Sequence, residues 1–184
     1  MIEIAVSERC LKRLRRELRL AGAQEIGGVL AGEHLADGRF LVVDLSVQRT
    51  GGGFAHFERD APLHRRFMRR FFARTGHQYA RYNYLGEWHS HPSFVPWPSS
   101  TDIRQMQQLV EEGSQTAMFL ALMVVKLDRM GVVEGSAHAF RPGMLPLHVE
   151  LASESGQSLS SPVTRPQTSR AWLAWRRERA EFVS

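Results

Sequence analysis

Cysteine is almost absent from this chain of 184 residues, because Cys10 is the only one. A single cysteine excludes an intrachain disulfide and any zinc site built from several thiolates. A catalytic cysteine is one alternative, but Cys10 falls in a helical pattern beside Leu11 and Leu14. A free cysteine in such a place usually packs as a small apolar side chain, so a packing role is the favoured interpretation.

Long hydrophobic runs are also missing, since no apolar stretch approaches the roughly 18 residues of a membrane span. The opening MIEIAVSERC lacks the charged, apolar and small-residue succession of a signal peptide. Hydrophobic residues still make up 43% of the chain, enough for a buried core and too many for a disordered chain. We therefore expect a cytoplasmic protein with no membrane partner.

Lysine is scarce, with Lys12 and Lys126 alone, so arginine carries most of the positive charge behind the net charge of +5. The arginines gather in segments 9–19 and 65–74 and in the tail, mostly on helical patterns where solvated charged faces are ordinary. No nucleic-acid fold motif accompanies them, which ranks nucleic-acid binding last among the functions considered. An acidic partner surface is left open.

Alternating apolar patterns predict strands and helices in a mixed order. Strands are expected at 2–6, 25–35, 38–48, 82–91, 117–125, 132–140 and 145–151. Helices are expected from the N-cap Ser7 to about Arg19, from Pro62 through Phe72, and from Ser99 or Ser100 to Gly113. This order predicts an α/β protein with a mixed central β-sheet flanked by helices.

The composition changes near residue 152. The stretch ASESGQSLSSPVTRPQTS is typical of a linker, and RAWLAWRRERAEFV predicts a short basic amphipathic helix. We predict a domain over residues 1–152 and a linker with a C-terminal helix over residues 153–184. Trp172 and Trp175 favour docking of that helix on its own domain or a partner rather than on a membrane.

The stretch GEWHSHPSFVPWPSSTD, residues 86–102, has the residue types of a metal site. Strand side chains alternate, so His89 and His91 point to the same face. Asp102 falls in the first turn of the following helix, where a carboxylate suits the helix dipole. Two histidines and one carboxylate leave an open fourth position for a water, as in catalytic zinc sites.

Hydrolysis at such a site also needs a general base and a donor to the oxyanion. Ser99 is placed to donate a hydrogen bond to a tetrahedral intermediate. Two glutamates compete for the role of base. Glu87 shares the face of His89 by strand parity, whereas Glu25 lies far back at the head of a glycine-rich strand.

HSHPSFVPWPSSTD fits the pattern H-x-H-x7-S-x2-D and resembles the JAMM/MPN-plus (JAB domain) metalloproteases. EIGGVLAG resembles the upstream family segment in which a glutamate precedes a glycine-rich strand. The resemblance covers residues 1–151 and implies an MPN (JAB) fold with one Zn²⁺ per chain on His89, His91 and Asp102. It assigns the general base to Glu25 and the oxyanion donor to Ser99.

GEWHSHP and FERD (57–60) look most like the bacterial branch of that family. The resemblance implies a deubiquitinase-like isopeptidase or peptidase that cleaves after the C-terminus of a ubiquitin-like protein, in deconjugation or precursor processing. It implies activating-enzyme and conjugating-enzyme homologues as partners, as in antiphage conjugation operons. The alternative is a catalytically silent MPN scaffold that binds ubiquitin-like partners. The oligomeric state is left open.

Residues around the motif have structural interpretations as well. Trp88 alternates away from the metal face and is expected in the core, while Trp97 either packs the motif or lines a substrate groove. Glycines 27, 28 and 32 suit close backbone approach, and TGGGFAH (50–56) is a candidate lip of the groove. The six other histidines have no partner at ligand spacing: His34, His56, His64, His77, His138 and His148.

Overall fold

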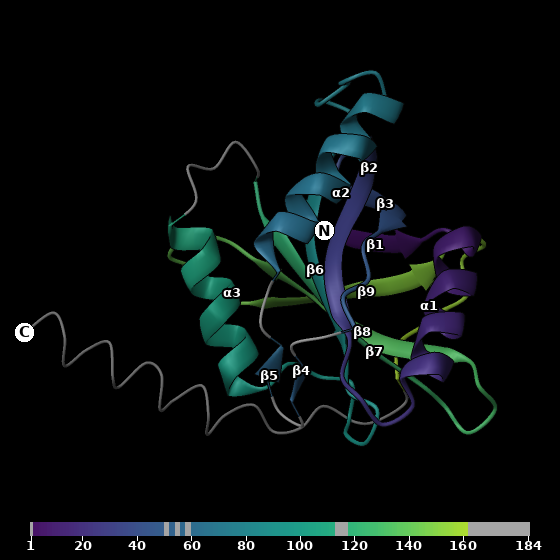
Figure 1. Ribbon diagram of the computed structural model, residues 1–184. Coiled ribbons are helices and arrows are strands. Elements are labelled where there is room, and N and C mark those ends of the chain that lie inside the picture. The colour runs from purple at the N-terminus through teal and green to yellow at the C-terminus, as the bar shows by residue number, and fades with distance from the viewer. Residues whose placement is uncertain (1, 50–51, 54–55, 58–59, 113–117, 162–184) are drawn as a thin grey trace, which may run out of the picture.

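Figure 1 shows the protein as a computed structural model, which describes residues 2–49, 52–53, 56–57, 60–112 and 118–161. The long strands are β1 (Glu3–Val6), β2 (Gly27–Ala36), β3 (Arg39–Leu45), β6 (Tyr82–Ser90), β7 (Leu120–Leu127), β8 (Val133–Phe140) and β9 (Leu147–Ser153). The helices are α1 (Glu8–Ala21), α2 (Ala61–Arg74) and α3 (Ser100–Glu112). β4 (Gly52–Gly53) and β5 (His56–Phe57) form a separate two-stranded sheet.

The long strands form a mixed sheet in the order β1-β3-β2-β6-β7-β8-β9, and this sheet closes into a barrel. β1 pairs in parallel with β3 on one side and with β9 on the other, which joins the two edges. The predicted α/β class and mixed sheet are confirmed. The prediction of a sheet flanked by helices has to be refined, because β1 removes the open edges that such a sheet would have.

Local signals place the helix starts. The Ser7 side chain caps α1 by accepting a hydrogen bond from the Cys10 N–H at 3.3 Å, as predicted. Cys10 itself is buried, and this burial raises the pKa of its thiol. Both findings support the packing role, because the thiolate is the reactive form of cysteine. Asp60 caps α2 by accepting from the Leu63 N–H at 2.9 Å.

β7 is apolar from Leu120 to Val125 because that part of the strand is buried on both faces. Ala121, Met123 and Val125 belong to the large core that fills the barrel and supports α1. The intervening residues Leu122 and Val124 pack in a second core with residues of α3. A strand whose alternate side chains pack into two different cores has no face in water, which explains the continuous hydrophobic run in the sequence.

The chain beyond β9 continues to contact the barrel. Ser158 pairs with Ala152, Ser160 pairs with Gly135, and Leu159 is buried in the core. Residues 162–184 lie outside the described residues, so the division at residue 152 and the C-terminal helix stay predictions. The candidate lip at 50–56 falls largely outside them as well. No helix in the described ranges is long and apolar enough to cross a membrane.

Candidate metal centre

The centre is built on the end of β6, in the middle of the sheet. β6 pairs antiparallel with β2, where His89 faces Gly27, and parallel with β7, where His89 faces Val124. The His91 N–H donates to the carbonyl of Val125 at 3.0 Å, so β7 also holds the second histidine in place. Both histidines are buried, and their Nε2 atoms lie 3.2 Å apart. The predicted common face is confirmed.

The third group comes from the first turn of α3. Asp102 Oδ2 lies 3.5 Å from His89 Nε2 and 3.8 Å from His91 Nε2. The Ser99 backbone N–H donates to the same Oδ2 at 2.7 Å, and the Asp102 N–H donates to Ser99 Oγ at 3.2 Å. Ser99 is therefore the N-cap of α3, the first of the two residues that the sequence allowed.

These three groups fit a single small cation. A tetrahedral zinc ion with bonds of ~2.0–2.2 Å holds its ligand atoms about 3.3–3.6 Å apart. The observed separations of 3.2, 3.5 and 3.8 Å bracket that range. Within the described parts of the chain, His89, His91 and Asp102 are the group of side chains found to meet the geometry of a metal site. The donor set of two imidazoles and a carboxylate suits zinc.

The protonation states of His91 and Asp102 also favour the binding of a cation. The carbonyl of Val95 can only accept, so His91 Nδ1 donates to it at 3.2 Å and leaves Nε2 as a lone-pair donor. Burial and the neighbouring His89 lower the pKa of His91. Burial opposes ionisation of Asp102, but His89 and Ser99 outweigh it and lower its pKa to about 2. A neutral imidazole and an ionised carboxylate are the forms that bind metal.

Glu25 lies at the edge of this centre. The neighbouring Ile26 carbonyl accepts from the Ser90 N–H at 2.8 Å, and the Ile26 N–H donates to Ser90 Oγ at 3.0 Å. This register, continued by one residue, sets Glu25 opposite His91. Burial raises the pKa of the Glu25 carboxyl, the charge of His89 lowers it and that of Asp102 raises it again. Glu25 is thus a buried carboxyl within electrostatic reach of the two groups.

The close backbone approach expected of the glycines is confirmed at two positions. A Cβ on Gly28 would lie 2.2 Å from the carbonyl oxygen of Ser46, and one on Gly32 would lie 3.0 Å from the Leu85 side chain. The contact at Gly28 lets β2 lie against Ser46, the residue that follows β3. The Trp88 indole N–H donates to the same Ser46 carbonyl at 2.9 Å, and Trp88 is buried as predicted.

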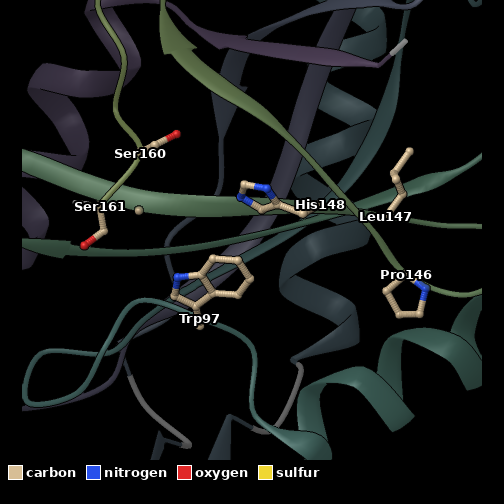
Figure 2. Close-up of a pocket in the computed structure, with 7 residues that line it drawn as sticks. Trp97, Pro146, Leu147, His148, Ser160 and Ser161 are labelled. Atoms are coloured by element: carbon tan, nitrogen blue, oxygen red, sulfur yellow. The ribbon is translucent and has the colours of Figure 1, made fainter. Parts of the chain in front are cut away.

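Sequence reasoning named Trp97 but missed the two histidines, His138 and His148, that hold it in the loop between the metal ligands. Figure 2 shows Trp97 beside His148, with which its ring stacks at 4.9 Å, and Trp97 also meets the His138 ring edge-on at 5.0 Å. Ser136 Oγ donates to the carbonyl of Pro96 at 2.6 Å. Trp97 therefore packs the loop and also lines a pocket of about 480 Å³. The direct pairing of β8 with β9 brings the two histidines together, a contact with no local sequence signal.

Comparisons with known proteins agree with this geometry. The profile of the family described as prokaryotic homologs of the JAB domain matches residues 7–140. A protein of Enterobacter hormaechei subsp. hoffmannii, named CD-NTase/cGAS isopeptidase, is 24% identical over an alignment of 154 residues, and the match covers 79% of each chain. The solution structure of a Desulfitobacterium hafniense protein superposes with a TM-score of 0.56 at 16% identity, and the match covers 85% of this chain and 94% of that one. That structural match supports the fold alone.

Proposed function

We propose that this chain, which belongs to the family of prokaryotic homologs of the JAB domain, is a zinc-dependent isopeptidase or peptidase. The observation that carries the proposal is the meeting of His89, His91 and Asp102 at separations that suit one zinc ion. When bound, zinc would polarise the scissile carbonyl and lower the pKa of a water in its open position.

The residues around that position would share the remaining work. Glu25 accepts a proton from the attacking water and passes it to the leaving amine, and its raised pKa brings it closer to the range in which a carboxylate can do both. Ser99 donates a hydrogen bond to the oxyanion. Its Oγ accepts the Asp102 N–H, which holds the hydroxyl at the start of α3 beside the metal ligands. No covalent intermediate on the protein is needed.

The substrate that we propose is a protein joined to the C-terminal glycine of a ubiquitin-like modifier. Support comes from the Enterobacter relative, which is named CD-NTase/cGAS isopeptidase. We also propose a role in bacterial antiphage conjugation, on the resemblance of GEWHSHP and FERD to the bacterial branch of the family. A slender C-terminal tail could enter such a site by pairing with a strand edge.

The test uses ubiquitin-like proteins extended by a short peptide beyond their terminal glycine. The zinc-loaded chain is incubated with each fusion, and the products are identified by intact-mass spectrometry. We expect cleavage after the glycine that stops with a chelator and returns with added zinc. Cleavage that is insensitive to the chelator would contradict zinc dependence. Tight binding of a ubiquitin-like protein without cleavage, at full zinc occupancy, would favour the scaffold alternative.

A further inference from the structure

Asp44, at the end of β3, is a buried carboxylate that three arginines share. Arg13 Nη1 lies 3.2 Å from Oδ1, and Arg9 Nη2 lies 3.5 Å from Oδ2, to which Arg74 also donates. Arg9 and Arg13 come from α1 and Arg74 from the last turn of α2. In Figure 1, strands β2 and β3 run between these two helices.

Glu17, one helical turn beyond Arg13 in α1, is a second buried carboxylate that pairs with more than one arginine. Its side chain is only 2% exposed, yet it pairs with Arg16 at 2.7 Å and with Arg49, which donates two hydrogen bonds. Arg49 follows Gln48, whose backbone pairs with Gly27. Gly27 in turn lies opposite the metal-centre residue His89. Arg49 is therefore close to β2, the strand next to the proposed active site.

We name these five side chains the arginine ridge: Arg9, Arg13, Arg16, Arg49 and Arg74. The five guanidinium groups face two carboxylates, which leaves an excess of three positive charges. One bidentate guanidinium can satisfy a carboxylate, so the ridge holds more arginine than burial of Asp44 and Glu17 requires. The arginines stay 39–73% exposed while their carboxylates are at most 8% exposed.

The ridge has the form of a binding surface. Arg9, Arg13 and Arg16 recur at helical spacing along one face of α1. A hollow of about 690 Å³ lies at the Arg9 end of this face and is lined by Arg9, Asp44 and Arg74. Glu33 also lines the hollow, but it is already paired with Arg81 at 2.7 Å, so it leaves the positive excess intact.

We infer that the arginine ridge binds an acidic segment of a partner protein. The buried carboxylates hold the guanidinium groups in place, so binding costs less side-chain entropy than it would at free arginines. Exposed planar guanidiniums match carboxylates in two-pronged hydrogen bonds. Single-stranded nucleic acid usually needs aromatic rings for stacking. The aromatic residues that line the hollow are Phe71, which is buried, and Tyr82, whose ring Arg81 already covers.

The probe is a fluorescein-labelled peptide of alternating glutamate and serine, read by fluorescence anisotropy at low salt. The test variant combines Arg9→Gln, Arg16→Gln and Arg74→Gln. It keeps Arg13 on Asp44 and Arg49 on Glu17, so neither buried carboxylate loses its last partner. The control variant has the same net charge and changes three exposed arginines for which the structure shows no carboxylate partner among the described residues: Arg65, Arg104 and Arg129. Thermal melting verifies that both variants fold.

The wild-type chain should bind the peptide, and a version with glutamine in place of glutamate should not bind. The test variant should bind about tenfold more weakly, as expected for three exposed charge pairs, while the control variant keeps the wild-type affinity. The inference is overturned by a wild type that does not bind, by equal losses in the two variants, or by tighter binding of an oligothymidylate of equal charge. Because binding is read without cleavage, the outcome is independent of the proposed hydrolysis.

Discussion

Ser99 and Asp102 hold each other at the start of α3. The Ser99 N–H donates to Asp102 Oδ2 at 2.7 Å, and the Asp102 N–H donates to Ser99 Oγ at 3.2 Å. Oδ2 is also the carboxylate oxygen that lies nearest to His89 Nε2. The helix cap therefore aims the carboxylate at the histidine pair, and one serine links the start of the helix to the geometry of the metal centre.

Ser99→Ala removes a hydroxyl to which we assign two roles. Loss of the oxyanion donor should lower kcat about 10²-fold, and loss of the cap should lower the free energy of unfolding by about 1 kcal/mol. Zinc content should be unchanged, because the backbone N–H of residue 99 still holds Asp102. Kinetics, urea unfolding and metal analysis measure the three effects, with Ser99→Thr as the variant that keeps a hydroxyl. Loss of zinc in the alanine variant would show that Ser99 serves the carboxylate instead.

Glu25→Gln should separate proton transfer from metal binding. The amide keeps the size of the side chain but cannot take a proton, so we expect full zinc content and a cleavage rate lower by about 10²–10⁴-fold. Glu87→Gln is the matched control, since Glu87 of β6 is the other glutamate considered for the base and accepts from Tyr84 Oη at 3.4 Å. Normal cleavage by Glu25→Gln together with a dead Glu87→Gln would transfer the role of base to Glu87.

Trp97→Ala should loosen the loop that precedes Asp102. The indole stacks on His148 and meets His138, while the same loop supplies the Val95 carbonyl that orients His91. Supporting contacts of metal ligands are worth about 10–100-fold in affinity, so zinc affinity should fall about tenfold in a competition with a chelating dye. Trp97→Phe should keep most of that affinity. Unchanged zinc affinity in the alanine variant would limit Trp97 to lining the pocket.

We expect the ionised Glu17 side chain to stabilise the fold at neutral pH and to lose this effect in acid. Burial opposes its ionisation, but hydrogen bonds from Arg16 and Arg49 prevail, and its pKa lies below the ordinary 4.5. A lowered pKa stabilises the fold at every pH above 4.5, and this gain is lost as the pH falls from there through the folded-state pKa. Glu17→Gln should therefore cost about 2 kcal/mol near neutral pH.

Urea unfolding of the wild type and of Glu17→Gln across this pH range measures that cost. The difference between the two should shrink as the solution becomes more acidic, because the wild-type carboxylate becomes protonated. A difference that is independent of pH would show that the packing of residue 17, rather than its charge, stabilises the fold.

The metal centre was readable in the sequence because its ligands lie within one strand–loop–helix segment. Alternation in β6 sets the two histidines on one face, and the cap signal at Ser99 begins the helix that carries Asp102. Barrel closure was not readable, since it depends on β1 pairing with both β3 and β9 across most of the chain. The contacts of Trp97 with β8 and β9 depend on the same long-range pairing, and no local pattern signals them.

The most direct test of the proposed metal centre is the zinc content of the purified chain, measured by elemental mass spectrometry beside His89→Ala. His34→Ala serves as the control, because this histidine lies outside the metal group and its ring stacks on Phe40. We expect one zinc per chain in the wild type and in His34→Ala, and none in His89→Ala. A wild type that holds no zinc even after zinc is added, or a His89→Ala variant that keeps it, would contradict the proposed centre.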